Sequence, residues 1–138
     1  MEKFTGKVWV LDDDIDTDII IPTEYLALKT IDDMKQYGFS PLRPELAGQI
    51  QKGDIIVAGK NFGCGSSREQ APEIIKALGI QCVIAKSFAR IFFRNSINNG
   101  LLLIEQPDLH DDIKEGDEVT VVTVSYTHLR AHETLSDL

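Results

Sequence analysis

The sequence has few cysteines and no long hydrophobic run. Its 138 residues contain two cysteines, Cys64 and Cys82, whereas small secreted domains that depend on disulfides carry more. No stretch approaches the roughly 18 continuous apolar residues of a membrane-spanning helix, and residues 1–4 lack the apolar region of a signal peptide. We therefore expect a cytoplasmic protein without a membrane segment. The length predicts one domain.

Basic residues are in the minority. The chain has 14 Lys and Arg against 22 Asp and Glu, for a net charge of −8, which argues against nucleic acid or an anionic membrane surface as partner. The distribution is uneven, because residues 60–94 hold six basic residues and two acids. This local excess of positive charge predicts a small anionic ligand.

Three glycines stand close together in residues 59–65. Before them, residues 54–58 form a short apolar run with β-branched side chains, which predicts a buried strand. After them, residues 71–78 have helical spacing, and Gly79 is a typical helix end. A glycine-rich connection between a strand and a helix is typical of a backbone that bends around a ligand.

The end of this connection has the residue types of an anion site. Gly63 and Gly65 can adopt positive φ without a Cβ penalty and bring backbone N–H groups close to a bound group. The first N–H donors of a helix are unpaired, and the helix dipole is positive there. We therefore expect an anion beside Ser66, Ser67 and Arg68.

Three other motifs use residues similar to those of this stretch. Ser66 and Glu69 have the spacing of a capping box, which needs no ligand, although a capping box does not require Arg68. A P-loop is excluded because Cys64 and Gly65 stand where it needs glycine and lysine. A dinucleotide fingerprint is excluded because Arg68 replaces its third glycine.

Three segments in this order carry a family resemblance: residues 14–22 (DIDTDIIIP), 61–69 (NFGCGSSRE) and 85–96 (AKSFARIFFRNS), the last followed by Asn99, Gly100 and Leu101. They closely resemble the signatures of the aconitase-family swivel domain, in its stand-alone form as the small subunit of 3-isopropylmalate dehydratase. The resemblance covers the chain from Gly6 to about Glu105. It implies an α/β fold, an aconitase-like swivelling β/β/α domain with a βαβ unit that carries the active-site loop.

The sequence also predicts the βαβ unit directly. Residues 82–85 form a second short apolar strand, so strand, helix and strand follow within about thirty residues. A right-handed crossover then places the loop 62–67 at the carboxyl end of the sheet, where open α/β folds bind ligands. Further elements are expected as strands at 7–11, 101–104 and 117–124, the last antiparallel, and as helices at 31–37 and from a Ser87 cap to Ile97.

The resemblance implies a reversible dehydration and rehydration in leucine biosynthesis that converts 2-isopropylmalate to 3-isopropylmalate through isopropylmaleate. It assigns the catalytic base to Ser66, as an alkoxide. It assigns substrate binding to Gly65, Ser67, Arg68 and Asp18: Ser67 helps build the oxyanion site, Arg68 grips a carboxylate and Asp18 orients substrate-binding groups. The alternatives are a homoaconitase or 2,3-dimethylmalate dehydratase small subunit, or a non-catalytic anion-binding module.

In the family, the segment Tyr25, Leu26, Ala27, Leu28 and Lys29 corresponds to a mobile loop that reads the side group of the substrate. The simpler interpretation is an ordinary surface connection. Ala27 and Leu28 are apolar and no arginine is present, which favours a branched aliphatic substituent. Because Lys29 is also in this segment, a substrate with an additional carboxylate stays an alternative.

The chain is not expected to hold a metal. An EF-hand loop that starts at Asp12 would need glycine at its sixth position and glutamate at its twelfth, where this chain has Thr17 and Thr23. Residues 12–18 are therefore expected to form a solvated acidic turn. The family's [4Fe–4S] cluster needs three thiolates, and we expect it on a separate large subunit. Cys64 as an independent nucleophile is a further possibility.

The resemblance ends near Val124. We expect residues 1–124 to form the swivel domain and residues 125–138 to be a non-native tail. His128 and His132 have the spacing of a helical metal pair, but a third ligand is missing.

Overall fold

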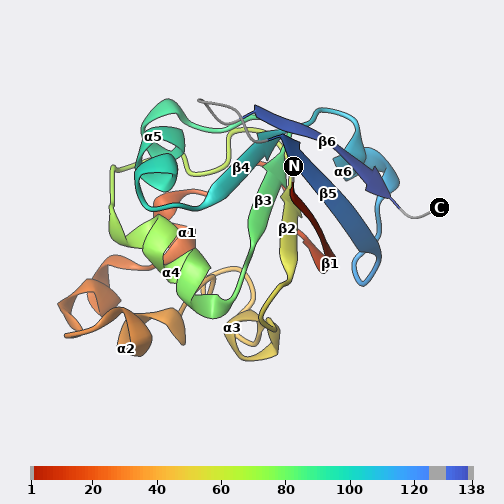
Figure 1. Ribbon diagram of the computed structural model, residues 1–138. Helices are drawn as coiled ribbons and strands as arrows, with labels where there is room; N and C mark the ends of the chain where they lie inside the picture. The colour runs from red at the N-terminus through yellow and green to blue at the C-terminus, as the bar shows by residue number, and fades with distance from the viewer. Residues whose placement is uncertain (1, 125–129, 137–138) are drawn as a thin grey trace.

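A six-stranded mixed sheet forms the centre of the protein (Figure 1). The computed structural model describes residues 2–124 and 130–136. The strand order is β4-β3-β2-β1-β5-β6. The strands are β1 (Glu2–Val10), β2 (Ile55–Ala58), β3 (Cys82–Ala85), β4 (Leu102–Glu105), β5 (Glu118–Val124) and β6 (Arg130–Ser136). Strands β1 to β4 pair in parallel, and β5 pairs antiparallel with β1 and β6, which confirms the α/β class.

Strand β1 belongs to both halves of this sheet. Its end, Val8 to Val10, pairs in parallel with β2, and its beginning pairs antiparallel with β5. It is longer than the predicted strand 7–11, because β5 supplies hydrogen-bond partners to residues with little apolar periodicity. The antiparallel strand predicted at 117–124 is confirmed as β5.

Short helices fill the connections: α1 (Thr17–Ile20), a 3₁₀ helix η1 (Thr23–Ala27), α2 (Ile31–Lys35), α3 (Leu46–Gln49), α4 (Gln70–Leu78), α5 (Arg90–Asn98) and α6 (Leu109–Asp112). Figure 1 shows α4 and α5 beside the parallel strands, and α6 at the opposite side near β5. In the described part of the chain, no helix combines the length and the apolar character needed to cross a bilayer.

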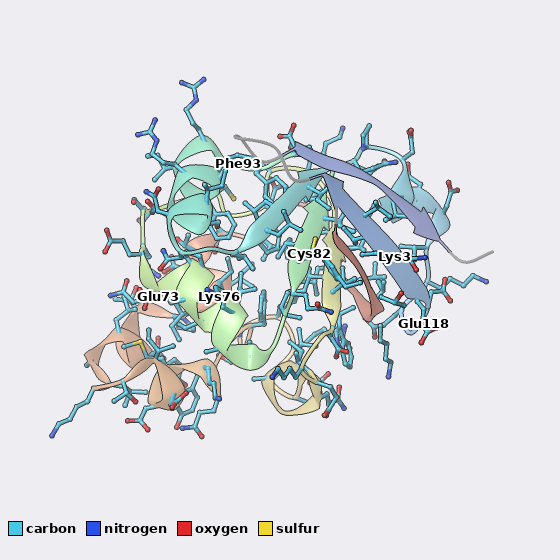
Figure 2. All side chains as sticks on the ribbon, viewed as in Figure 1. Lys3, Glu73, Lys76, Cys82, Phe93 and Glu118 are labelled. Carbon is cyan, nitrogen blue, oxygen red and sulfur yellow. The ribbon has the colours of Figure 1, made fainter. Side chains whose placement is uncertain are left out.

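Two apolar cores cover the two faces of the parallel strands. On one face, Ile56 and Val83 pack with Ile74 and Ile75 of α4. On the other face, Ile55, Val57, Cys82 and Ile84 pack with residues of α6 and β5, and Figure 2 shows Cys82 on its strand. Strands β2 and β3 are therefore buried on both sides, which explains their continuous apolar runs.

The predicted βαβ unit is confirmed as β2-α4-β3. Helix α4 ends at Gly79, whose φ is 109° and whose N–H bonds the carbonyls of Ile75 and Lys76. This left-handed C-cap is the role expected for the glycine. Helix α3 was not predicted, because one turn around the buried Leu46 has too few residues for periodicity to show.

Candidate functional site

The glycine-rich loop is held by the acidic segment that follows β1. Hydrogen bonds to backbone carbonyls join them, among them Asp14 N–H to Lys60 (2.8 Å), Gly63 N–H to Ile15 (2.7 Å), Thr17 N–H to Cys64 (2.9 Å) and Thr17 Oγ1 to Ser66 (2.8 Å). We call residues 12–17 the strap. The first two family signatures are thus neighbours in space, although about fifty residues separate them.

Carboxylates of the strap accept hydrogen bonds from backbone N–H groups. Asp13 Oδ1 accepts from the Lys60 N–H at 2.7 Å, and Asp16 Oδ1 caps α1 by accepting from Ile19 N–H at 2.9 Å. Within the described residues, no three His, Cys, Asp or Glu side chains are grouped as a metal site. The expected acidic turn is present, and its carboxylates fix the loop in addition to meeting solvent.

Gly63 and Gly65 both have positive φ, +84° and +90°, as expected. Gly63 also has no room for a side chain, because a Cβ there would lie 2.2 Å from Phe92 Cγ. The loop therefore rests directly on the first turn of α5. Beneath it, the rings of Phe62 and Phe92 pack edge to face at 5.4 Å.

A pocket of about 210 Å³ opens between the loop and α5. Residues Gly65, Ser66, Ser67 and Arg68 line one wall, and Ala89 to Phe92 line the other. Thr17, Gly63 and Asn95 complete the lining. The structure therefore brings four of the predicted site residues to one cavity.

Arg68 is fixed at the edge of this pocket. Its side chain is 13% exposed and lies 2.6 Å from Asp18 Oδ1. It also donates to the Ile21 carbonyl at 2.9 Å and to Thr23 Oγ1 at 2.9 Å. Asp18 does not line the pocket. It contacts the Arg68 guanidinium, as a residue that orients Arg68 would.

The helix predicted at 71–78 is confirmed as α4, which begins at Gln70. No side chain caps it, so the capping box from Ser66 to Glu69 is not formed and Ser66 lies outside the first turn of α4. Instead, the beginning of α5 borders the pocket. Its cap residue Ala89 makes no side-chain capping bond, and in the described chain no acceptor is bonded to the N–H groups of residues 90–92.

Ser87 does not begin α5 as predicted. Helix α5 starts three residues later, at Arg90, and Ser87 Oγ accepts from the Asn61 N–H at 2.8 Å. The hydroxyl therefore stabilises the glycine-rich loop, and the positive end of α5 is left facing the pocket.

The segment Tyr25 to Lys29 lies away from this pocket. Tyr25 to Ala27 are the last residues of η1, and the Tyr25 ring stacks on Tyr37 with centroids 4.0 Å apart. Leu26 and Leu28 pack partly against the core. Thr23, at the start of the same η1 helix, accepts a hydrogen bond from Arg68. The predicted role of the segment in specificity stays a prediction.

Sequence reasoning missed the α5 side of the pocket. Arg90, Ile91 and Asn95 line it, and the Asn95 Nδ2 lies 3.5 Å from Ser67 Oγ. Two signals were available: the excess of basic residues between Lys60 and Arg94, and the third family signature. Neither indicated which side chains of the helix would reach the cavity.

The cysteines do not fit a nucleophile or a cluster. Burial raises the pKa of the half-buried Cys64 thiol, and the carboxylates of Asp16 and Asp14 raise it further. Burial likewise raises the pKa of Cys82 far above its ordinary value. Both thiols are therefore protonated near neutral pH, which argues against Cys64 as a nucleophile, and two cysteines cannot supply three thiolates.

Comparison with known proteins decides the family. A model of the aconitase C-terminal domain matches residues 15–109. The small subunit of 3-isopropylmalate dehydratase from Lachnospira eligens is 81% identical over 128 residues, which cover 92% of this chain and 78% of that protein. The chain belongs to this small-subunit family. The Heliobacterium modesticaldum member is 56% identical over 119 residues, 86% of this chain and 72% of that protein.

The solved structures agree with this family. The crystal structure of 3-isopropylmalate dehydratase (LeuD) from Methanocaldococcus jannaschii superposes with a TM-score of 0.84 at 45% identity, covering 88% of this chain and 71% of that one. The aconitase-like fold predicted from the three signatures is therefore confirmed.

Proposed function

We propose that this chain is the small subunit of a 3-isopropylmalate dehydratase, which interconverts 2-isopropylmalate and 3-isopropylmalate in the cytoplasm together with a large subunit. The observation that carries the proposal is the pocket wall of Ser66, Ser67 and Arg68 in a chain 81% identical to a protein of that name. A non-catalytic anion-binding module would be favoured if Ser66 and Arg68 pointed away from any cavity, and both line one.

In this proposal Ser66 removes the proton. The reaction takes a proton from a carbon next to a carboxylate, and a serine oxygen is strong enough only as an alkoxide. The Ser66 carbonyl is held by Thr17, which fixes the peptide that carries the oxygen. The uncapped start of α5 across the pocket supplies the electrostatic field that favours an oxyanion.

Arg68 binds a substrate carboxylate in this proposal. Its contacts with Asp18, Ile21 and Thr23 engage part of its five N–H donors and hold the planar group in one orientation. Asp18 thus orients the binding group, and Ser67 and Gly65 shape the cavity beside it. The isopropyl group is accommodated by apolar side chains, with the Tyr25–Lys29 segment as the predicted selector.

The second half of the reaction lies with the partner. A [4Fe–4S] cluster would supply the Lewis acidity needed for the departing hydroxide, and we place it on the large subunit because the thiols of this chain do not fit it. The pocket is open, so the large subunit also has to cover it and exclude water. The chain alone is expected to be inactive.

The test is Ser66→Ala in the enzyme assembled with a 3-isopropylmalate dehydratase large subunit. We expect turnover to fall by at least about 10²–10⁴-fold, the usual contribution of a positioned base, while calorimetry shows nearly unchanged binding of 3-isopropylmalate. Ser40→Ala, outside the pocket, is the matched control and should retain activity. Normal turnover by Ser66→Ala would remove this serine from the mechanism.

A further inference from the structure

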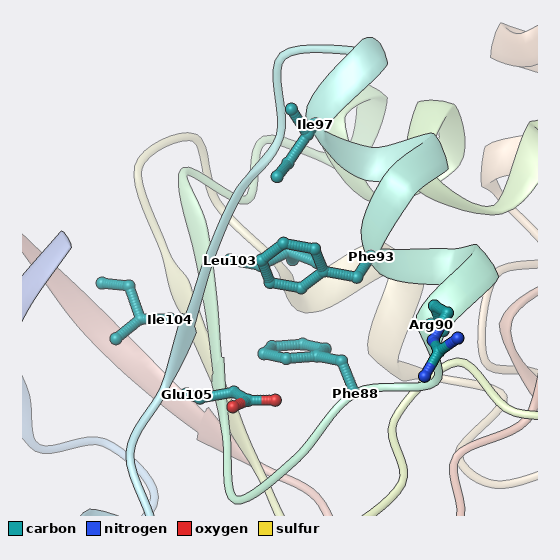
Figure 3. Close-up of a pocket in the computed structure, with 7 residues that line it drawn as sticks. All are labelled: Phe88, Arg90, Phe93, Ile97, Leu103, Ile104 and Glu105. Carbon is teal, nitrogen blue, oxygen red and sulfur yellow. The ribbon is translucent and has the colours of Figure 1, made fainter. Parts of the chain in front are cut away.

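Arg90 and Arg68 both line the candidate pocket, Arg90 from α5 and Arg68 from the glycine-rich loop. It is the first residue of α5, it is exposed, and it lines the cavity that contains Ser66. It also lines a second, larger pocket of about 520 Å³ with Phe88 and Glu105. Figure 3 shows Arg90 at the start of α5 and Glu105 on β4, on either side of Phe88 in this view.

The two arginines differ in how their charge is compensated. The guanidinium of Arg68 lies 2.6 Å from the Asp18 carboxylate, so this pair is close to neutral as a unit. Arg90 forms no ion pair with any carboxylate of the described residues. Helix α5 contains no acidic residue. The uncompensated positive charge at this cavity therefore comes from the α5 wall.

We propose that Arg90 is a second carboxylate-binding residue, which holds one end of a hydroxy-dicarboxylate while Arg68 holds the other. The proposal rests on the proposed function for its substrate, which has two carboxylates. One arginine that is already paired with Asp18 is poorly suited to bind both. A second arginine, which lines the same cavity from another element, gives the dianion a positive partner for its other carboxylate and helps to orient it beside Ser66.

Arg94 provides a matched control. It lies on the same helix, one turn after Arg90, and is also exposed, but it does not line the pocket. Arg90→Gln and Arg94→Gln therefore remove the same charge from the same helix. Arg90→Lys keeps the charge and removes the planar fork.

The experiment uses the chain assembled with a 3-isopropylmalate dehydratase large subunit. We expect Arg90→Gln to raise KM at least about tenfold with a smaller change in kcat, because the lost contact binds substrate and transition state alike. Arg94→Gln should stay within about twofold of wild type, and Arg90→Lys should recover part of the loss. The concentration of large subunit that gives half-maximal activity should be the same for all variants.

Calorimetric titration with malate, a bare hydroxy-dicarboxylate, separates this inference from the proposed function. If wild type fails to convert isopropylmalate, the proposed function is wrong, and malate binding still tests Arg90. Weaker malate binding by Arg90→Gln than by Arg94→Gln supports the inference. Equal effects of the two variants, absence of malate binding to wild type, or a shift only in large-subunit affinity would overturn it.

Discussion

Replacing Gly63 by alanine tests the close contact between the glycine-rich loop and α5. Gly63 has φ +84°, and a Cβ would lie 2.2 Å from Phe92 Cγ and 2.5 Å from Phe92 Cβ. The left-handed backbone costs a residue with a Cβ about 1–2 kcal/mol. Overpacking a buried contact costs about 1–3 kcal/mol more, so we expect Gly63→Ala to destabilise the fold by about 2–5 kcal/mol.

Urea unfolding followed by tryptophan fluorescence measures this change. The sequence has one tryptophan, Trp9, which is 7% exposed in the folded chain and becomes solvated on unfolding. With a urea dependence of about 1.5–2 kcal/mol per molar, the midpoint should fall by roughly 1–3 M. The expected loss of about 2–5 kcal/mol is a large part of the unfolding free energy of a typical domain, about 5–15 kcal/mol.

Gly48→Ala is the control. Gly48 lies in α3, and a Cβ there would meet no atom within 4 Å. Alanine in a helix is favoured over glycine by about 0.5–1 kcal/mol, so this variant should be unchanged or slightly stabilised. If Gly63→Ala unfolds at the same urea concentration as wild type, the loop does not press on Phe92 and the geometry of the pocket is wrong.

Three further predictions concern the site, the stability and the partner. Arg68→Lys should raise KM and lower kcat, because one ammonium cannot keep the contacts with Asp18 and the Ile21 carbonyl and also bind a carboxylate as a fork; wild-type kinetics would make Arg68 structural. The bidentate hydrogen bond from Arg43 lowers the pKa of Glu115 below its ordinary 4.5, so its stabilising effect is present above that pH and is lost as pH falls below it. Since Glu115 is 39% exposed, Glu115→Gln should lower stability at pH 7 by at most about 1 kcal/mol. The stabilities of both proteins, measured by urea unfolding, should converge as the pH falls well below the ordinary pKa of Glu115; a difference that persists in acid would contradict this linkage. The purified chain should be colourless and inactive after anaerobic reconstitution with iron and sulfide, and an active iron-containing preparation would refute the division of labour between subunits.

The elements that were predicted well are those whose signal is local. The runs of β2 and β3 are apolar because both faces of these strands are covered, and α4 has a full amphipathic period with a glycine end. The start of α5 was predicted three residues too early because the Ser87 hydroxyl can either cap a helix or bond to a neighbouring loop. A serine near a helix start predicts a cap, but here the Asn61 N–H, 26 residues earlier in the chain, donates to the Ser87 hydroxyl.

The candidate site shows the same limit. The residue types Ser66, Ser67 and Arg68 were identified from their sequence and their family resemblance, and they do line one pocket. The contact between Arg68 and Asp18 joins residues fifty positions apart, and the orientation of Arg90 depends on where α5 begins. Both are decided by tertiary packing, which leaves no periodic pattern in the sequence.

The strap has a consequence for attempts to transplant this site. A fragment of residues 54–105 would carry the glycine-rich signature, the βαβ unit and α5, and a sequence search would recognise it. It would lack the hydrogen bonds by which Thr17, Asp14 and Ile15 hold the loop. A graft into another α/β scaffold therefore has to import the segment after β1 as a second, discontinuous piece, in register with the loop. Without that piece, the recipient would display the family's motif on a backbone free to take other shapes.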